Sequence, residues 1–324
     1  MMSALPHYVR GDGTVRLTGL GAGWGGEHDE PQKGGLGGEV CAGATMTAVE
    51  VDAWDLRHLL LSLEERARDQ RDSNDLDAVA ARAIAALARI PARPPIIVPG
   101  EMSAPMVVEG LPLWILEGNG WLLAPRGAGG DCVVVDVPPS PEALVSRIDA
   151  LGLNPVAVLL THGHVDHAGG AGALLRILGR SVPVHVHPAD RDLVLHPERD
   201  GVMARVAPDV CPPPANALVP MTDGATLIVG GVKMTAVHTP GHTPGSVCLL
   251  VEGGARPLLF SGDTLFAAGT GRCDLPGGSR PLAEESLRSL IAPLADETVV
   301  LPGHGGITTI GAERDQLTRP PLAA

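Results

Sequence analysis

The segment THGHVDHAGG, residues 161–170, is the feature that most constrains how this chain can fold. It places three histidines and an aspartate within six residues, although the whole chain of 324 residues contains only 12 histidines. It follows the apolar run Val156–Leu160, which predicts a buried strand, and it precedes a helical pattern at residues 171–178. The polar cluster is therefore expected where a strand ends, at one edge of a sheet.

Imidazole and carboxylate groups at this spacing are typical of a transition-metal site. Alternation along an extended backbone directs His162 and His164 to the same side, and Asp166 and His167 follow on the next turn. Zinc, iron and manganese accept neutral imidazole and carboxylate as ligands. A polar turn with solvent-facing histidines is the alternative, but it gives no reason for four donors in six residues. We expect a metal site that is completed from elsewhere in the chain.

Three later segments offer the missing donors, each at the end of a predicted strand. His242 lies in GHTPGS, Asp263 follows the apolar strand PLLF in SGDTLF, and His304 follows TVV in LPGHG. Glycine beside each of them allows the backbone to approach a bound group closely.

From about residue 104 onward, short apolar segments alternate with turns and helical patterns. Strands are predicted at residues 106–110, 113–118, 120–125, 132–137, 155–160, 182–187, 226–238 (a hairpin turning on Gly230-Gly231), 247–252, 257–263 and 298–304. Helices are predicted at residues 140–151, with Ser140 as the N-cap, and at residues 171–178 and 284–291. Meanders followed by alternating strands and helices predict an α/β domain whose sheets carry helices on their outer faces.

The first hundred residues have a different character. Residues 1–45 are rich in glycine without apolar periodicity, which predicts a disordered leader. Residues 46–100 are predicted to form a helical hairpin extension and a proline-rich connector, ARPPIIVPG, and the main domain is expected at residues 104–324. The helical hairpin is expected to pack on the main domain or on a second subunit, which would make a homo-oligomer.

Composition excludes several classes of partner. The formal charge of −13, from 24 basic and 37 acidic residues, argues against nucleic-acid binding. The five cysteines are far apart and form no CxxC pair, as expected for reduced thiols in a cytoplasmic protein. No apolar run approaches the length of about 18 residues that a membrane span needs, and the N-terminus lacks the pattern of a signal peptide. We therefore expect a cytoplasmic protein without a nucleic-acid or membrane partner.

The order HxHxDH, GHTPGS, SGDTLF and LPGHG resembles the metallo-β-lactamase superfamily, over residues 104–317. The resemblance implies an αββα four-layer sandwich, here with an N-terminal helical extension, and a dinuclear metal site at one edge of its two sheets. It further implies which residues bind the first metal (His162, His164 and His242), which bind the second (Asp166, His167 and His304), and which residue bridges the two (Asp263). His238 is then expected to be structural.

Two further segments resemble the glyoxalase II-like hydrolases, which cleave hydroxyacylglutathione thioesters: FSGDTLFAAGTGRCDLPGGS and LPGHGGITTIGAE. The resemblance implies two divalent ions, zinc in first place with iron or manganese as alternatives, and a bridging hydroxide that attacks a small-molecule thioester. Asp166 and Asp263 would be the catalytic carboxylates. Arg272 is expected to bind substrate, with a salt bridge to Asp274 as the alternative.

Other members of the superfamily provide the competing interpretations. Persulfide dioxygenases share the fold and use one iron, held by the counterparts of His162, His242 and Asp263, but the ending Pro-Gly-His-Gly of this chain favours hydrolysis over the HDY-like ending of that class. A lactonase or another esterase is a further alternative. Asp263 stands where β-lactamases usually carry cysteine, which argues against antibiotic hydrolysis as the main activity. A non-catalytic relic is disfavoured because all seven ligands are present.

Overall fold

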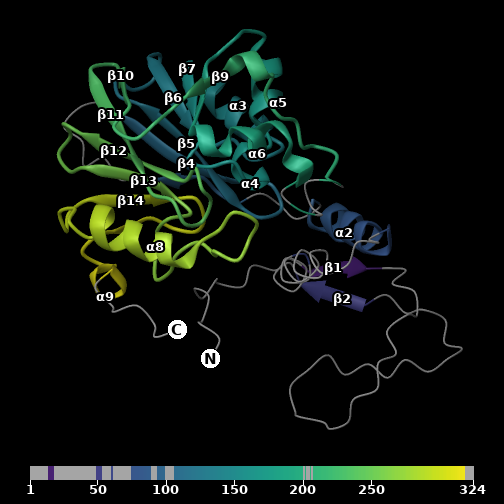
Figure 1. Ribbon diagram of the computed structural model, residues 1–324. Coiled ribbons are helices and arrows are strands. Elements are labelled where there is room, and N and C mark those ends of the chain that lie inside the picture. Colours follow the sequence, from purple (N-terminus) through teal and green to yellow (C-terminus); the bar gives the residue numbers. More distant parts are fainter. Residues whose placement is uncertain are drawn as a thin grey trace, which may run out of the picture. The chain divides into compact units, whose positions relative to one another are not determined.

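The computed structural model describes residues 14–17, 49–52, 60, 74–88, 93–98, 106–199, 201, 205 and 207–317 (Figure 1). The chain contains two compact units, one of Arg10–Pro91 and a larger one that includes Ala92–Ala324. Among the described residues, no helix combines the length and the apolar character required to cross a membrane.

The described residues of the smaller unit form a two-stranded antiparallel sheet and a long helix. Strands β1 (Thr14–Leu17) and β2 (Val49–Asp52) pair with each other, and α2 spans Asn74–Leu87. Helix α2 buries one face, because its buried residues recur at intervals of three and four: Ala80, Ala83, Ile84 and Leu87. Strand β1 falls within residues 1–45. The rest of the predicted leader and most of the first predicted helix lie outside the described residues, so the proposed domain boundaries stay predictions.

The larger unit begins with a seven-stranded sheet. Its order is β3 (Ile96–Ile97), β4 (Val107–Leu113), β5 (Gly118–Ala124), β6 (Asp131–Val135), β7 (Asn154–Leu159), β8 (Val184–Val186) and β9 (Leu218–Pro220). Pairs from β3 to β6 are antiparallel, and pairs from β6 to β9 are parallel. The parallel pairs bring the carboxyl ends of β6 and β7 to the same edge.

A second sheet contains six strands. Its order is β10 (Thr226–Val229), β11 (Val232–His238), β12 (Val247–Glu252), β13 (Leu258–Gly262), β14 (Val299–Pro302) and β15 (Thr308–Thr309). All neighbours are antiparallel except β13 and β14, which are parallel. The residues that follow β13 and β14 therefore also lie at one edge.

Alternating burial along the strands builds four layers. In β6, Val133 and Val135 point into the core between the two sheets, where they meet Leu249 and Phe260 of the second sheet. Residues between them in β6, such as Val134, point to the opposite face. Helices α3 (Glu142–Ala150) and α5 (Ala171–Leu178) cover that outer face, and α8 (Arg280–Ser286), continued by a π-helical turn Leu287–Ile291, lies on the outer face of the second sheet (Figure 1). The predicted αββα sandwich is confirmed.

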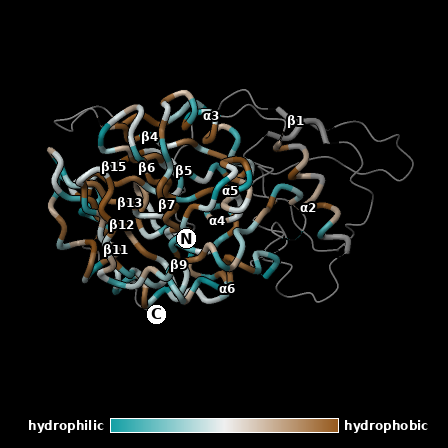
Figure 2. Tube along the Cα trace, turned by 90° about the horizontal axis from the view of Figure 1, so that it is seen from above, coloured by the Kyte–Doolittle hydropathy of each residue, from teal (hydrophilic) through white to brown (hydrophobic). Residues whose placement is uncertain are grey.

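The colouring by hydropathy agrees with this layering. In Figure 2 the hydrophobic stretches follow the central strands, including β6, β7 and β12, whereas hydrophilic stretches occupy many of the connecting segments. Strands that are buried on both faces read as continuous apolar runs, which is why their limits were predictable from sequence.

Two local predictions are wrong. Residues 113–118 do not form a strand of their own, because Trp114 and Glu117 adopt positive φ angles of 59° and 56° and form the turn between β4 and β5. Ser140 does not cap α3: it also has a positive φ, its hydroxyl donates to Asp209 at 2.5 Å, and Pro141 is the residue at the N-cap.

Short elements complete the larger unit. Helix α4 (Val165–Ala168) carries part of the HxHxDH segment, and a 3-10 turn (Pro188–Asp190) leads into α6 (Arg191–Leu195). Two further 3-10 turns span Pro197–Arg199 and Ala215–Ala217, and α9 spans Arg314–Leu317.

Candidate metal centre

The structure brings all seven predicted donors to one edge of the sandwich. They follow β7, β11, β13 and β14. Backbone hydrogen bonds join the two sheets at this edge: Thr161 O accepts from Val247 N at 2.8 Å, and Gly303 O accepts from Asn119 N at 2.7 Å. Segments more than a hundred residues apart in sequence therefore meet in a small volume.

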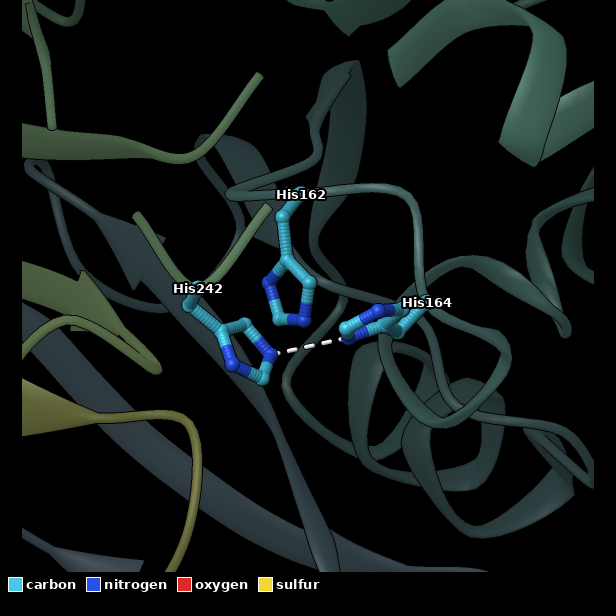
Figure 3. Close-up of side chains that lie close together, drawn as sticks. All are labelled: His162, His164 and His242. Carbon is cyan, nitrogen blue, oxygen red and sulfur yellow. Dashed lines mark hydrogen bonds between the residues drawn. The ribbon is translucent and has the colours of Figure 1, made fainter. Parts of the chain in front are cut away.

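The first group of donors is His162, His164 and His242, whose ligand atoms lie within 4.8 Å of one another. Figure 3 shows the three rings converging, with the dashed line joining Nδ1 of His164 to Nε2 of His242 at 2.8 Å. All three side chains are buried. Three imidazoles that share one point in the interior could hold a metal ion.

The second group is Asp166, His167 and His304, again within 4.8 Å of one another. Nε2 of His304 lies 3.2 Å from Oδ2 of Asp166 and 3.2 Å from Nε2 of His167. Helix α4 provides the first two residues, and the loop after β14 provides the third. The predicted turn at Asp166 and His167 is thus one short helical turn, and the ligand atoms of both residues lie within 4.8 Å of each other.

Asp263 lies between the two groups. Its Oδ2 atom is 3.5 Å from Nε2 of His242, and its Oδ1 atom is 3.3 Å from Nε2 of His167. Oδ2 is also 3.8 Å from Nε2 of His304. One carboxylate therefore reaches both groups, as a bridging ligand must.

The two groups of donors differ in the pKa values of their side chains. Burial lowers the pKa of His162 well below its usual value, lowers that of His164, and lowers that of His242 to about 4. These three rings are therefore neutral at pH 7, and a neutral imidazole offers a lone pair to a cation.

The second group carries charge. Burial alone would lower the pKa of His167 and His304, but the carboxylates of Asp263 and Asp166 outweigh it and raise both values. Burial likewise opposes ionisation of Asp166 and Asp263, yet the neighbouring His167 and His304 lower the pKa of both acids. A divalent cation held here would meet the same two carboxylates that raise the pKa of these imidazoles.

A buried aspartate orients His167. Asp136, which directly follows β6, accepts from Nδ1 of His167 at 2.9 Å, from the Thr161 N–H at 2.7 Å and from the Thr161 hydroxyl at 2.7 Å. The contact leaves Nε2 of His167 facing the other donors. In the same way, Nδ1 of His242 donates to the carbonyl of Arg272 at 2.6 Å, which leaves its Nε2 for the cluster.

A second buried aspartate joins the loops that carry the first group. Asp190 accepts from the N–H of Gly163 at 2.9 Å, the hydroxyl of Thr243 at 2.6 Å and the N–H of Gly245 at 2.7 Å. Gly163 lies between His162 and His164, and Thr243 follows His242. The carboxylate therefore fixes the distance between two segments that must present ligands to one point.

The loop that carries His304 is held by β5. Asn119 donates from Nδ2 to the carbonyls of Pro302 at 2.9 Å and Gly305 at 3.0 Å, and Trp121 donates from Nε1 to Pro302 O at 3.0 Å. Gly303 has to be glycine, because a Cβ there would lie against Oδ1 of Asp263 and 2.6 Å from Cε1 of His167.

This order of motifs on two packed sheets agrees with the family comparison, in which residues 114–304 match the metallo-beta-lactamase superfamily. The chain belongs to the metallo-β-lactamase superfamily. The matched range contains all seven donors and both supporting aspartates.

Three comparisons locate the chain within the superfamily. It is 41% identical over 220 residues to an uncharacterized protein of Mycobacterium tuberculosis, covering 64% of this chain and 95% of that protein. It is 32% identical over 192 residues to the hydroxyacylglutathione hydrolase GloC of Haemophilus influenzae, covering 57% of this chain and 84% of that enzyme. The crystal structure of the BLEG-1 B3 metallo-beta-lactamase superposes with a TM-score of 0.57 at 33% identity, covering 66% of this chain and 100% of that one.

The donors of this superfamily member fit divalent cations. Nε2 of His162 is buried and has no hydrogen-bond partner within the described part of the chain. Oδ1 of Asp263 is also buried without a hydrogen bond there, although His167 lies 3.3 Å away. Leaving buried polar atoms unpaired is costly, and a cation between the two groups would satisfy both.

Other predicted residues have separate roles. Arg272 forms a bidentate ion pair with Asp274, with contacts of 2.7 Å and 2.6 Å, so the geometry corresponds to the structural alternative and its substrate role stays a prediction. His238 contacts the carbonyl of Pro244 at 2.9 Å and stacks on His187, outside the cluster.

Sequence reasoning missed three supporting residues: Asp136, Asp190 and Asn119. For Asp136 a signal existed, because a single acid directly follows an apolar strand, as Asp263 does. Asp190 and Asn119 carried no comparable signal, since the groups that they bind lie on loops that are distant in sequence.

Proposed function

We propose that the protein is a dinuclear metal-dependent hydrolase that cleaves a small-molecule thioester of the hydroxyacylglutathione type. The position of Asp263 supports the binding of two metals, because its carboxylate reaches His242 on one side and His167 on the other. Similarity to GloC supports the thioester part. Zinc is the first candidate for both metals, with iron and manganese as alternatives, since histidine and aspartate accept all three.

When bound, two divalent cations acidify a water molecule and neutralise the negative charge that develops on the acyl oxygen. The side chains of the protein hold the metals and orient the water molecule. His162, His164 and His242 present neutral nitrogens, since burial lowers the pKa of each. Asp166 and Asp263 supply negative charge, and their carboxylates are placed to orient a water molecule and hold its proton.

Thioester hydrolysis suits this arrangement. A thiol has an ordinary pKa of about 8.5, so the thiolate departs without first receiving a proton. An amine leaving group requires protonation, so amide substrates demand an additional proton donor. The site contains aspartates that are held ionised beside imidazoles, and these act as bases rather than as acids.

A β-lactam is the second candidate substrate, because the BLEG-1 structure is 33% identical to this chain and is a B3 metallo-beta-lactamase. The metal donors alone fit either substrate. The leaving group distinguishes them, because a lactam nitrogen requires a proton, and turnover on each substrate measures the difference.

The test combines metal analysis with three substrates. Purified protein is expected to contain about two equivalents of divalent metal and to hydrolyse S-lactoylglutathione, with slower turnover of a chromogenic cephalosporin. Faster lactam turnover would reverse the assignment. One iron per chain with oxygen consumption on glutathione persulfide would identify a dioxygenase, and absence of transition metal would contradict every enzymatic assignment.

A further inference from the structure

The seven donors differ in their exposure to solvent, and the difference defines an open side. His162, His164 and His242 are 1%, 4% and 5% exposed. The side chains of Asp166 and His304 are 15% and 23% exposed. A substrate therefore reaches the cluster from the side of Asp166 and His304.

Phe266 lies on this open side. Its ring centroid is 6.1 Å from that of His304, the two ring planes are nearly perpendicular at 89°, and the side chain is only partly buried. The chain contains two phenylalanines, and the other, Phe260, is fully buried between the sheets. In a protein whose core is almost entirely aliphatic, a partly exposed aromatic ring beside a metal-site histidine calls for an explanation other than core packing.

The loop that carries Phe266 is fixed in place. Phe266 and Gly269 pair through two backbone hydrogen bonds of 2.7 Å and 3.3 Å. Gln316 donates to the carbonyl of Phe266 at 3.2 Å. Glu313, which is 7% exposed, accepts from the N–H of Ala268 at 2.9 Å and from the hydroxyl of Thr308 at 2.5 Å.

The backbone of this loop is strained, which makes the support by Glu313 significant. Ala268 has a φ of 58°, in the left-handed region that residues with a side chain adopt infrequently. Such a conformation persists where the surroundings determine it. The buried carboxylate of Glu313 therefore holds the loop in a single position, and the Phe266 ring is a rigid wall beside the open side.

We propose that Phe266 forms the wall against which the acyl part of the substrate lies, and that it limits the size of the acyl group. The inference rests on the proposed thioester hydrolysis. Of the two halves of such a substrate, glutathione carries carboxylates and an ammonium group that are costly to desolvate against an apolar ring. The carbon chain of the acyl group loses little by the same contact. The preferred acyl group is accordingly small and aliphatic.

The test is a change of selectivity in Phe266→Ala. The ratio of kcat/KM for S-mandeloylglutathione, which carries a phenyl group, to that for S-lactoylglutathione is expected to rise by about ten-fold or more. Phe266→Leu, which keeps an apolar side chain of similar reach, is expected to stay near the wild-type ratio. Metal content is expected to be unchanged in both variants.

Two further variants test whether a change in the ratio comes from the position of Phe266 or from a general disturbance of the protein. Glu313→Gln removes one acceptor of the loop and is expected to shift the ratio in the same direction by a smaller factor. Ile228→Ala changes an exposed residue on β10, four strands away from β14 in the sheet, and is expected to leave the ratio unchanged.

The outcomes distinguish this inference from the proposed function. If the wild-type protein hydrolyses both thioesters and Phe266→Ala keeps their ratio, the wall is refuted while thioester hydrolysis stands. Phe266→Ala could instead change only the relative kcat/KM of two thioesters that share an acyl group and differ in the thiol. In that case Phe266 faces the thiol, and the inference is again refuted. If metal-loaded wild-type protein hydrolyses no thioester, both fail.

Discussion

Asp136 accepts a hydrogen bond from Nδ1 of His167 at 2.9 Å, and both side chains are almost completely buried. The contact fixes which nitrogen of the ring faces the second group of donors. Because Asp136 also binds the backbone and hydroxyl of Thr161, the residue before His162, it connects the ends of β6 and β7. Each of the three partners offers a hydrogen, so the Asp136 side chain is the acceptor in every contact.

Asp136→Asn is expected to weaken binding of the metal held by the second group by about 10- to 100-fold. The amide nitrogen would face Nδ1 of His167 and favour the tautomer that protonates Nε2. Competition with a chromogenic chelator measures the affinity of each metal. Asp209→Asn, a matched change at a residue that contacts Ser140 instead, should bind both metals as the wild type does. Equal affinities in the two variants would contradict the role of Asp136.

Asp190→Ala is expected to destabilise the protein even without metal. It leaves the N–H groups of Gly163 and Gly245 and the hydroxyl of Thr243 without their buried acceptor. Each unpaired group costs about 1–3 kcal/mol, so the free energy of unfolding should fall by about 3 kcal/mol or more.

Denaturant unfolding of the metal-free protein measures this loss. The control is Asp192→Ala two residues away, whose side chain is 69% exposed and whose removal should change stability by less than about 0.5 kcal/mol. A loss seen only in metal-loaded Asp190→Ala would show that the carboxylate acts on the metal and not on the two loops.

Acidification is expected to release the two metals in sequence. The pKa values of His167 and His304 are raised above their usual value, so protons compete for these rings already near neutral pH. Those of His162 and His164 are lowered and that of His242 is about 4, so protons compete for the first group only at lower pH. Metal binding to the second group should therefore be lost first as pH falls.

Dialysis at a series of pH values followed by metal analysis tests this order. The metal content should fall from about two equivalents to about one as the pH falls through the neutral range, and to zero only near pH 4, close to the pKa of His242. Simultaneous loss of both metals would mean that the two groups do not differ in proton affinity.

The convergence of these seven side chains could be predicted because the segments that carry them follow recognisable apolar strands, whereas their assignment as metal ligands came from the family resemblance and stays a prediction. His162, Asp263 and His304 come directly after strands whose limits are clear from continuous hydrophobic runs, and strand ends gather at the edges of sheets. The covering of the sheets by helices was predictable from the alternation of strands and helices, whereas the four-layer αββα arrangement was implied by the family resemblance.

Other features depend on tertiary contacts and could not be predicted. Trp114 and Glu117 belong to a segment that is as apolar as a strand, and only their positive φ angles make it a turn. Ser140 precedes proline like many N-caps, yet its hydroxyl binds Asp209 across a loop. Asp190 acts on backbone groups of segments that are distant in sequence, and its own neighbours give no indication of that role.

Gly303→Ala is expected to abolish activity while leaving the protein folded. The added Cβ would lie against Oδ1 of Asp263 and 2.6 Å from Cε1 of His167, so the bridging carboxylate must move. Gly306→Ala, three residues further on, is the matched control because its Cβ would have no neighbour within 4 Å. Turnover of S-lactoylglutathione and circular dichroism are measured together. Full activity in Gly303→Ala would mean that the loop after β14 adapts without disturbing Asp263.

Asp263→Ala is expected to reduce turnover by at least about 10³-fold, because one carboxylate serves both metal groups and its loss removes a shared ligand and a negative charge. Affinity for both metals should fall, in contrast to Asp136→Asn, which affects mainly one. Asp149→Ala, at an exposed position on α3, should keep wild-type turnover and metal content. Near-wild-type activity in Asp263→Ala would contradict the bridging role, and loss of one metal with full retention of the other would assign Asp263 to a single group.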